Sequence, residues 1–175
     1  MKAIVVYESM YGNTRGIAEA IAEGLGGARV VHVSKAGLSP QADLLVVGGP
    51  THVHGIASLR SRQAAASAAR EDGGHLEPEA EQEPGLRSWL RDLEHVDARP
   101  AATFDTRVDR APWFTGVASR GIARRLRQRG YQVVGSESFL VMDSEGPLED
   151  GELERARAWG AGLAQRQAVR AEALS

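Results

Sequence analysis

Short polar side chains gather in one stretch near the amino terminus, Ser9-Met10-Tyr11-Gly12-Asn13-Thr14. The stretch lies between an apolar run and a helical pattern, so it should form the amino end of a helix, where backbone N–H groups are unpaired and carry partial positive charge. Gly12 lets the backbone curl without a clashing Cβ. Neutral donors of this kind suit a dianionic monophosphate. Helix capping by the same side chains is the alternative interpretation.

Other phosphate-binding motifs are absent from the sequence. There is no G-x-x-x-x-G-K-[ST] segment, so the chain is not a P-loop NTPase, and no G-x-G-x-x-G segment follows the first strand, so a dinucleotide Rossmann site is not expected. A phospho-receiver domain would need an aspartate at the end of the third predicted strand, where this chain has Gly48-Gly49-Pro50-Thr51. The predicted anion site therefore belongs to another class of protein.

Alternating strand and helix patterns place this loop in an α/β fold. Short apolar runs predict strands at Ala3–Tyr7, Arg29–Val33, Asp43–Gly48, Ala101–Phe104 and Tyr131–Val141. Apolar residues at helical spacing predict helices around Ile17–Leu25, Pro84–Glu94, Ala118–Leu126 and Leu153–Leu163. The alternation predicts a five-stranded parallel sheet in the order 2-1-3-4-5 with helices on both faces. Ligands of such sheets bind beyond the carboxyl ends of the strands, here between the first and third.

The 175 residues are enough for one domain, which we expect to span residues 1–167 with a frayed tail at 168–175. The segment 56–84 after the third strand is irregular. Residues 57–70 are rich in alanine and could form a helix, whereas residues 71–84 are acidic and contain glycine and proline. We expect residues 71–84 to form an exposed, mobile loop, which is either a lid or, more simply, a solvated connection.

Composition excludes several classes of protein. The chain has no cysteine, so disulfides, thiolate metal sites and thiol catalysis are excluded. No apolar run approaches the roughly 20 residues that span a bilayer, and the start does not resemble a cleaved signal peptide. The net charge of −2 gives no general attraction to nucleic acid or to a membrane surface. We therefore expect a cytoplasmic protein that binds neither nucleic acid nor membrane.

The stretch from Val5 to Thr14, continuing to Ile21, resembles the signature of the flavodoxin family along its whole length. The segment from Gly48 to Gly55 resembles the second flavin loop more loosely, and Thr103–Arg107 lies where the third flavin loop would fall. The resemblance implies a flavodoxin-like three-layer sandwich that binds FMN non-covalently. It places the phosphate at residues 9–14 and the ring between the other two loops.

The ring site has an unusual composition for this family. Pro50, Thr51 and Gly55 can bring backbone close to a ring, and His52 and His54 could stack on it or donate hydrogen bonds. Flavodoxins usually place aromatic residues here, and Trp113 and Phe114 could supply them or pack under the following helix. The two histidines have no evident third partner, so a metal site is not expected. The candidate cofactor-binding residues are Ser9, Met10, Tyr11, Gly12, Asn13, Thr14, Pro50, Thr51, His52, Val53, His54, Gly55, Phe104, Asp105, Thr106 and Arg107.

Arginines suggest two further hypotheses. Arg107 or Arg110 near the cofactor would stabilise its anionic reduced form by Coulomb attraction, or would be solvated loop residues. Five arginines between residues 120 and 129 would form either an ordinary solvated helix face or a docking surface for an acidic partner.

Three function classes follow from these patterns. The main interpretation is electron transfer through bound FMN, to a redox partner protein or a small-molecule acceptor. The alternative is an FMN-dependent NAD(P)H reductase of quinones or nitro compounds. A flavin-free interaction module is the third, against which the intact first loop argues.

Overall fold

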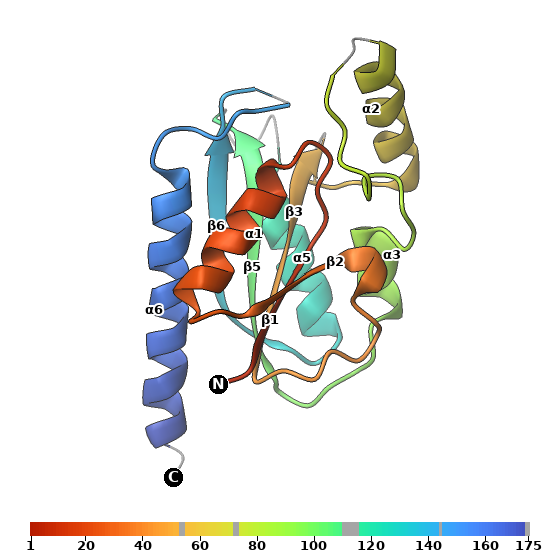
Figure 1. Ribbon diagram of the computed structural model, residues 1–175. Coiled ribbons are helices and arrows are strands. Elements are labelled where there is room, and N and C mark those ends of the chain that lie inside the picture. Colours follow the sequence, from red (N-terminus) through yellow and green to blue (C-terminus); the bar gives the residue numbers. More distant parts are fainter. Residues whose placement is uncertain (53–54, 72–73, 110–115, 144, 174–175) are drawn as a thin grey trace.

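A computed structural model describes residues 1–52, 55–71, 74–109, 116–143 and 145–173 of the chain. Strands and helices alternate along it, as the sequence predicts (Figure 1). The strands are β1 (Ala3–Tyr7), β2 (Arg29–His32), β3 (Leu44–His52), β4 (Gly55–Ile56), β5 (Pro100–Val108) and β6 (Gln132–Val141). The helices are α1 (Asn13–Gly24), the 3-10 turn η1 (Val33–Lys35), α2 (Leu59–Glu71), α3 (Leu86–Asp92), α5 (Ala118–Gln128) and α6 (Glu152–Glu172).

The parallel strands form one sheet in the order β2-β1-β3-β5-β6. Counted along the chain without the two-residue β4, this is the predicted order 2-1-3-4-5, so the predicted fold class is confirmed. β4 adds an antiparallel pairing to the end of β3, which no pattern in the sequence predicts. No helix in the described ranges is long and apolar enough to cross a membrane.

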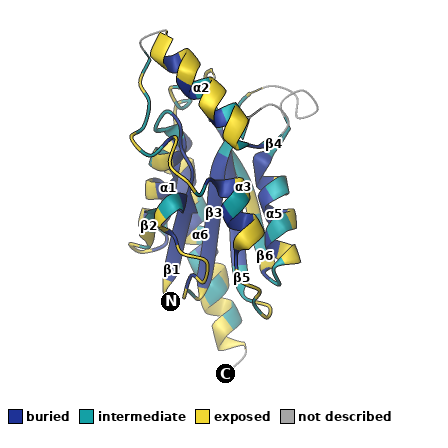
Figure 2. Cartoon of the chain, turned by 90° about the vertical axis from the view of Figure 1, so that its right-hand side faces the viewer, coloured by how far each residue is buried: buried dark blue, intermediate teal, exposed yellow. Residues whose placement is uncertain are grey.

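Alternation along the central strands divides the core between two faces of the sheet. In β1, Val5 points toward α1 and α6, whereas Ile4 and Val6 point toward α3 and α5. Helices α1 and α6 approach each other closely at Gly24 and Gly160, where a Cβ on either residue would meet backbone of the other helix. Figure 2 shows the strands buried between these layers. Helices thus cover both faces of the sheet, and the carboxyl ends of the strands are where a ligand site can form.

The segment after β3 departs in part from its prediction. The alanine-rich stretch forms α2, as expected, and lies beyond the carboxyl ends of the strands (Figure 1). The acidic residues that follow do not form a wholly exposed loop. Ala80 is buried in a small apolar cluster with Met10 and Ala66, and the backbone N–H of Glu77 donates to the Met10 carbonyl at 2.8 Å. The buried Ala80 side chain and this backbone hydrogen bond hold the segment directly against the first loop.

Strand β5 is longer than its apolar pattern predicts. It continues through Val108, so Thr103–Arg107 is strand rather than loop. Polar residues interrupt the apolar pattern of this strand, and the partners of their side chains come from distant segments. For example, Thr103 Oγ1 donates to Ser136 Oγ on β6 at 3.0 Å. At the other end of the chain, α6 continues to Glu172, into the segment for which we expected a frayed tail.

Candidate functional site

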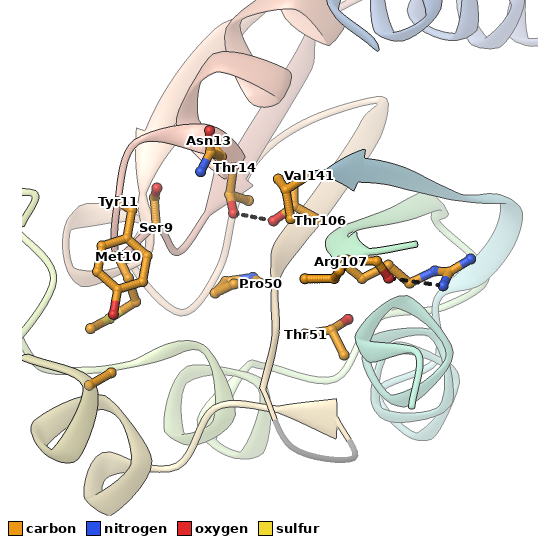
Figure 3. A pocket seen from close by; sticks show the side chains of 12 residues that line it. Ser9, Met10, Tyr11, Asn13, Thr14, Pro50, Thr51, Thr106, Arg107 and Val141 are labelled. Carbon is orange, nitrogen blue, oxygen red and sulfur yellow. Dashed lines mark hydrogen bonds between the residues drawn. The ribbon is translucent and has the colours of Figure 1, made fainter. Parts of the chain in front are cut away.

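A cavity of about 270 Å³ lies at the carboxyl ends of β1, β3, β5 and β6 (Figure 3). It is lined by nine of the predicted residues: Ser9, Met10, Tyr11, Asn13, Thr14, Pro50, Thr51, Thr106 and Arg107. Three further residues, Ala65, Val108 and Val141, complete it. The cavity joins the first loop, which follows β1, to the ends of β3 and β5. It therefore lies at the topological switch point of the sheet, between β1 and β3.

The first loop curls at Gly12 to place the amino end of α1 at this cavity. Gly12 has φ +93°, a left-handed conformation that favours glycine, and its N–H donates to Ser9 Oγ at 3.1 Å. No side chain caps α1, so the capping interpretation is not supported. Within the described chain, the backbone N–H groups of Asn13, Thr14 and Arg15 have no recorded acceptor. They form a set of donors suited to an anion.

Side chains fix the first turn of α1 against neighbouring segments. Thr14 Oγ1 and Thr106 Oγ1 lie 2.7 Å apart and share a hydrogen bond, and both residues are buried (Figure 3). Asn13 Nδ2 donates to the Glu145 carbonyl at 2.8 Å. These bonds tie the predicted anion site to β5 and to the segment after β6, so its donors are held in place before any ligand arrives.

A buried ion pair between Glu8 and Arg62 lies next to the first loop. Glu8 directly precedes Ser9 and is 1% exposed, and its Oε2 accepts the Leu86 N–H at 2.7 Å. Arg62 of α2 is 2% exposed; its Nε lies 3.8 Å from the same Glu8 oxygen, and its Nη atoms bind the Gln82 carbonyl and the Glu83 carboxylate. Burial raises the pKa of Glu8. Sequence reasoning missed this pair, because no local pattern marks Arg62 as buried.

The ends of β3 and β5 hold the amino terminus of α5. Thr51 Oγ1 accepts the Ala118 N–H at 3.1 Å, and Asp105 Oδ2 accepts the Ser119 N–H at 2.7 Å. Asp105 is fully buried and does not line the cavity, and burial raises the pKa of its carboxyl group despite that hydrogen bond. Asp105 therefore acts on the site through the position of α5.

We expect the replacement Asp105→Asn to change how stability depends on pH. A raised pKa means that the folded protein binds more protons than the unfolded chain, so wild-type stability falls as pH rises from the ordinary aspartate pKa through the raised one. The amide oxygen can still accept the Ser119 N–H and does not ionise. Urea unfolding across this window should show the variant gaining stability relative to wild type as pH rises, and a constant difference would contradict it.

The remaining predicted residues lie outside the lining. Phe104 is fully buried in the core, with its ring against Gly48 and edge-to-face with Phe139. Gly12 and Gly55 do not line the cavity, although Gly12 shapes the loop. His52 ends β3 and pairs with Gly55, the first residue of β4.

The other expectations fall on residues outside the described ranges, namely Val53, His54, Arg110, Trp113 and Phe114. Within those ranges, no group of three His, Asp or Glu side chains could hold a metal ion.

Comparisons with known proteins agree with this fold. The family model described as flavodoxin matches residues 5–159. A comparison with curated proteins found no match. Among solved structures, flavodoxin 2 from Bacillus cereus is 22% identical and covers 95% of this chain and 99% of its own, with a TM-score of 0.57. Flavodoxin 1 from the same organism is 19% identical, covers 94% and 98%, and has a TM-score of 0.60.

A flavodoxin from the domain Archaea is 20% identical, covers 95% of this chain and 98% of its own, and has a TM-score of 0.59. At these identities the solved structures show a shared fold, and the match of the family model over most of the chain shows the family. The chain belongs to the flavodoxin family, whose members bind FMN as their cofactor.

Proposed function

We propose that this protein transfers electrons through FMN bound non-covalently in the cavity at the carboxyl ends of the sheet. The phosphate would be held by the first turn of α1, and the ring would lie toward the ends of β3 and β5. One observation carries the proposal: a single cavity connects the unpaired N–H groups of that turn with Pro50, Thr51 and Arg107. The cofactor supplies one- and two-electron redox chemistry when it is bound.

The residues present fit this cofactor. The donors are backbone amides and the hydroxyls of Ser9 and Thr14, which suit a monophosphate, and the loop curls at Gly12 so that they converge. A volume of about 270 Å³ lies just below the roughly 300–1,000 Å³ of typical ligand pockets, which argues against a dinucleotide. Tyr11 and Met10 add apolar surface at the same opening.

Arg107 favours a second candidate, an FMN-dependent reductase that takes electrons from NAD(P)H. It is the one arginine in the described lining, and a positive charge there would stabilise the anionic reduced cofactor. Steady-state oxidation of NADPH or NADH with a quinone acceptor separates the candidates. Turnover by the purified protein alone would favour the reductase, whereas reduction only in the presence of a partner protein would favour the carrier. In either case the absence of cysteine is consistent with a cytoplasmic location.

Removing two hydroxyls from the phosphate site should weaken FMN binding. We expect the double variant Ser9→Ala/Thr14→Val to bind FMN at least about tenfold more weakly, because hydrogen bonds to a charged group contribute about 1.5–3 kcal/mol each. Riboflavin, which lacks the phosphate, should bind both proteins equally. Quenching of flavin fluorescence on titration measures both affinities.

The control is Thr103→Val, which removes a buried hydroxyl from β5 that does not line the cavity. Unchanged FMN affinity in the double variant, or an equal loss for FMN and riboflavin, would contradict the assignment of the phosphate site.

A further inference from the structure

A second cavity, of about 440 Å³, lies between α3, α5 and β4 and is lined by four arginines. Arg87 comes from α3, and Arg120, Arg124 and Arg125 come from α5. The two helices pack against each other, and α5 also packs on β4 (Figure 2). The four side chains, which we call the arginine cluster, therefore meet on one concave surface instead of spreading around a helix.

The charge of the arginine cluster is not neutralised by any of the residues that the structure describes. No ion pair is recorded for any of its four members in the described ranges, and no carboxylate lines the cavity. By contrast, Arg15, Arg155 and Arg157 each pair with a glutamate. Among the described residues, the cluster is thus a concentration of positive charge without a counter-charge.

Backbone carbonyls hold two members of the cluster in place. Arg87 Nη2 donates to the Ile56 carbonyl at 2.5 Å, and Arg125 Nη1 donates to the Gly121 carbonyl at 3.2 Å. Partial burial and then the charges of Arg87 and Arg124 lower the pKa of Arg125. Like charges held together in this way repel one another, and a bound anion would relieve that repulsion.

We propose that the arginine cluster binds the phosphate groups of a small oligophosphate ligand. Guanidinium groups bind phosphate oxygens through two parallel hydrogen bonds, and four of them around one hollow can hold more than one phosphate. The site is distinct from the cavity assigned to FMN, because the amino end of α5 lies between them: Thr51 lines the first cavity and accepts the Ala118 N–H, while Val117 and Arg120 line the second.

Isothermal calorimetry with inorganic pyrophosphate tests the proposal on the FMN-loaded protein. We expect the double variant Arg120→Ala/Arg124→Ala to bind pyrophosphate at least about tenfold more weakly than wild type, with an affinity that falls as salt is raised. The matched control is Arg127→Ala/Arg166→Ala, which removes the same charge from exposed positions outside the cavity and should bind as wild type does. FMN affinity should be unchanged in both variants, so failure of this proposal is distinguishable from failure of the proposed function.

Two outcomes would overturn the proposal: no heat of binding with pyrophosphate at low salt, or an equal loss in the cluster variant and the control. Competition then identifies the source of the phosphates. Displacement of pyrophosphate by NADPH but not by NADH would indicate a nucleotide that carries an extra phosphate, and displacement by neither would indicate a free oligophosphate. Both results support an oligophosphate site.

Discussion

The variant Arg62→Ala is expected to lose about 3–5 kcal/mol of unfolding free energy, a large part of the stability of a domain of this size. The reason is the buried charge of Glu8, which remains when its partner is removed. Glu8 and Arg62 are both almost completely buried, and without the guanidinium the Glu8 carboxylate either stays buried without a counter-charge or takes up a proton. Burial already raises the pKa of Glu8. The loss should therefore be greater at pH 8 than at pH 5.

Urea unfolding followed by circular dichroism measures this effect. Arg60→Ala is the control, because it removes an arginine from an exposed position two residues away on α2, and its effect should stay within about 0.5 kcal/mol. The double variant Glu8→Gln/Arg62→Met removes both charges and should recover much of the lost stability. Equal losses in the single and double variants would show that the contacts of Arg62 with the Gln82 carbonyl and the Glu83 carboxylate, and not its pairing with Glu8, stabilise the fold.

The same ion pair connects stability with the site. Glu8 is the residue before Ser9, so its position sets where the first loop leaves β1. Arg62 links that residue to α2 and to the acidic segment, whose Ala80 packs on Met10. A segment whose composition predicts an exposed loop, either a lid or a solvated connection, is thereby held against the loop assigned to the phosphate.

The fold was largely predictable because periodicity and turn residues act locally. The apolar runs of β1 and β3 marked buried parallel strands, and their alternation with amphipathic helices left few topologies. The second half of β5 was not predictable in this way. Asp105 and Thr106 are polar, and their burial depends on Ser119 and Thr14, which the chain brings together only in the folded state.

The lining of the candidate site was predictable to a similar extent and for the same reason. The polar residues of the first loop lie within one short stretch, so the sequence alone predicts an anion site there. Val141 and Ala65 line the cavity but carry no chemical signal, and only the topology brings the end of β6 and the middle of α2 to it. Phe104 was a candidate for ring contact because of its residue type, yet the alternation of β5 directs it into the core.

Replacing Gly12 by alanine should weaken FMN binding by at least about tenfold while the fold persists. Gly12 has φ +93°, where an L side chain costs about 1–2 kcal/mol, and a Cβ there would lie 3.1 Å from Oε1 of Glu77. The loop can relieve both problems only by changing its curl, which moves the N–H groups of Asn13 and Thr14 away from a common point. The affinity for riboflavin, which lacks the phosphate, should change much less.

Gly27→Ala is the matched control for this variant. Gly27 has φ +91° just beyond the other end of α1, and its Cβ would meet no atom within 4 Å. Its backbone strain is therefore similar, but it cannot act on the cavity. Fluorescence titrations of the three proteins with FMN and riboflavin separate strain from position. If Gly27→Ala lowers FMN affinity as much as Gly12→Ala does, the effect is a general loss of stability, and the curl of the first loop does not select the phosphate.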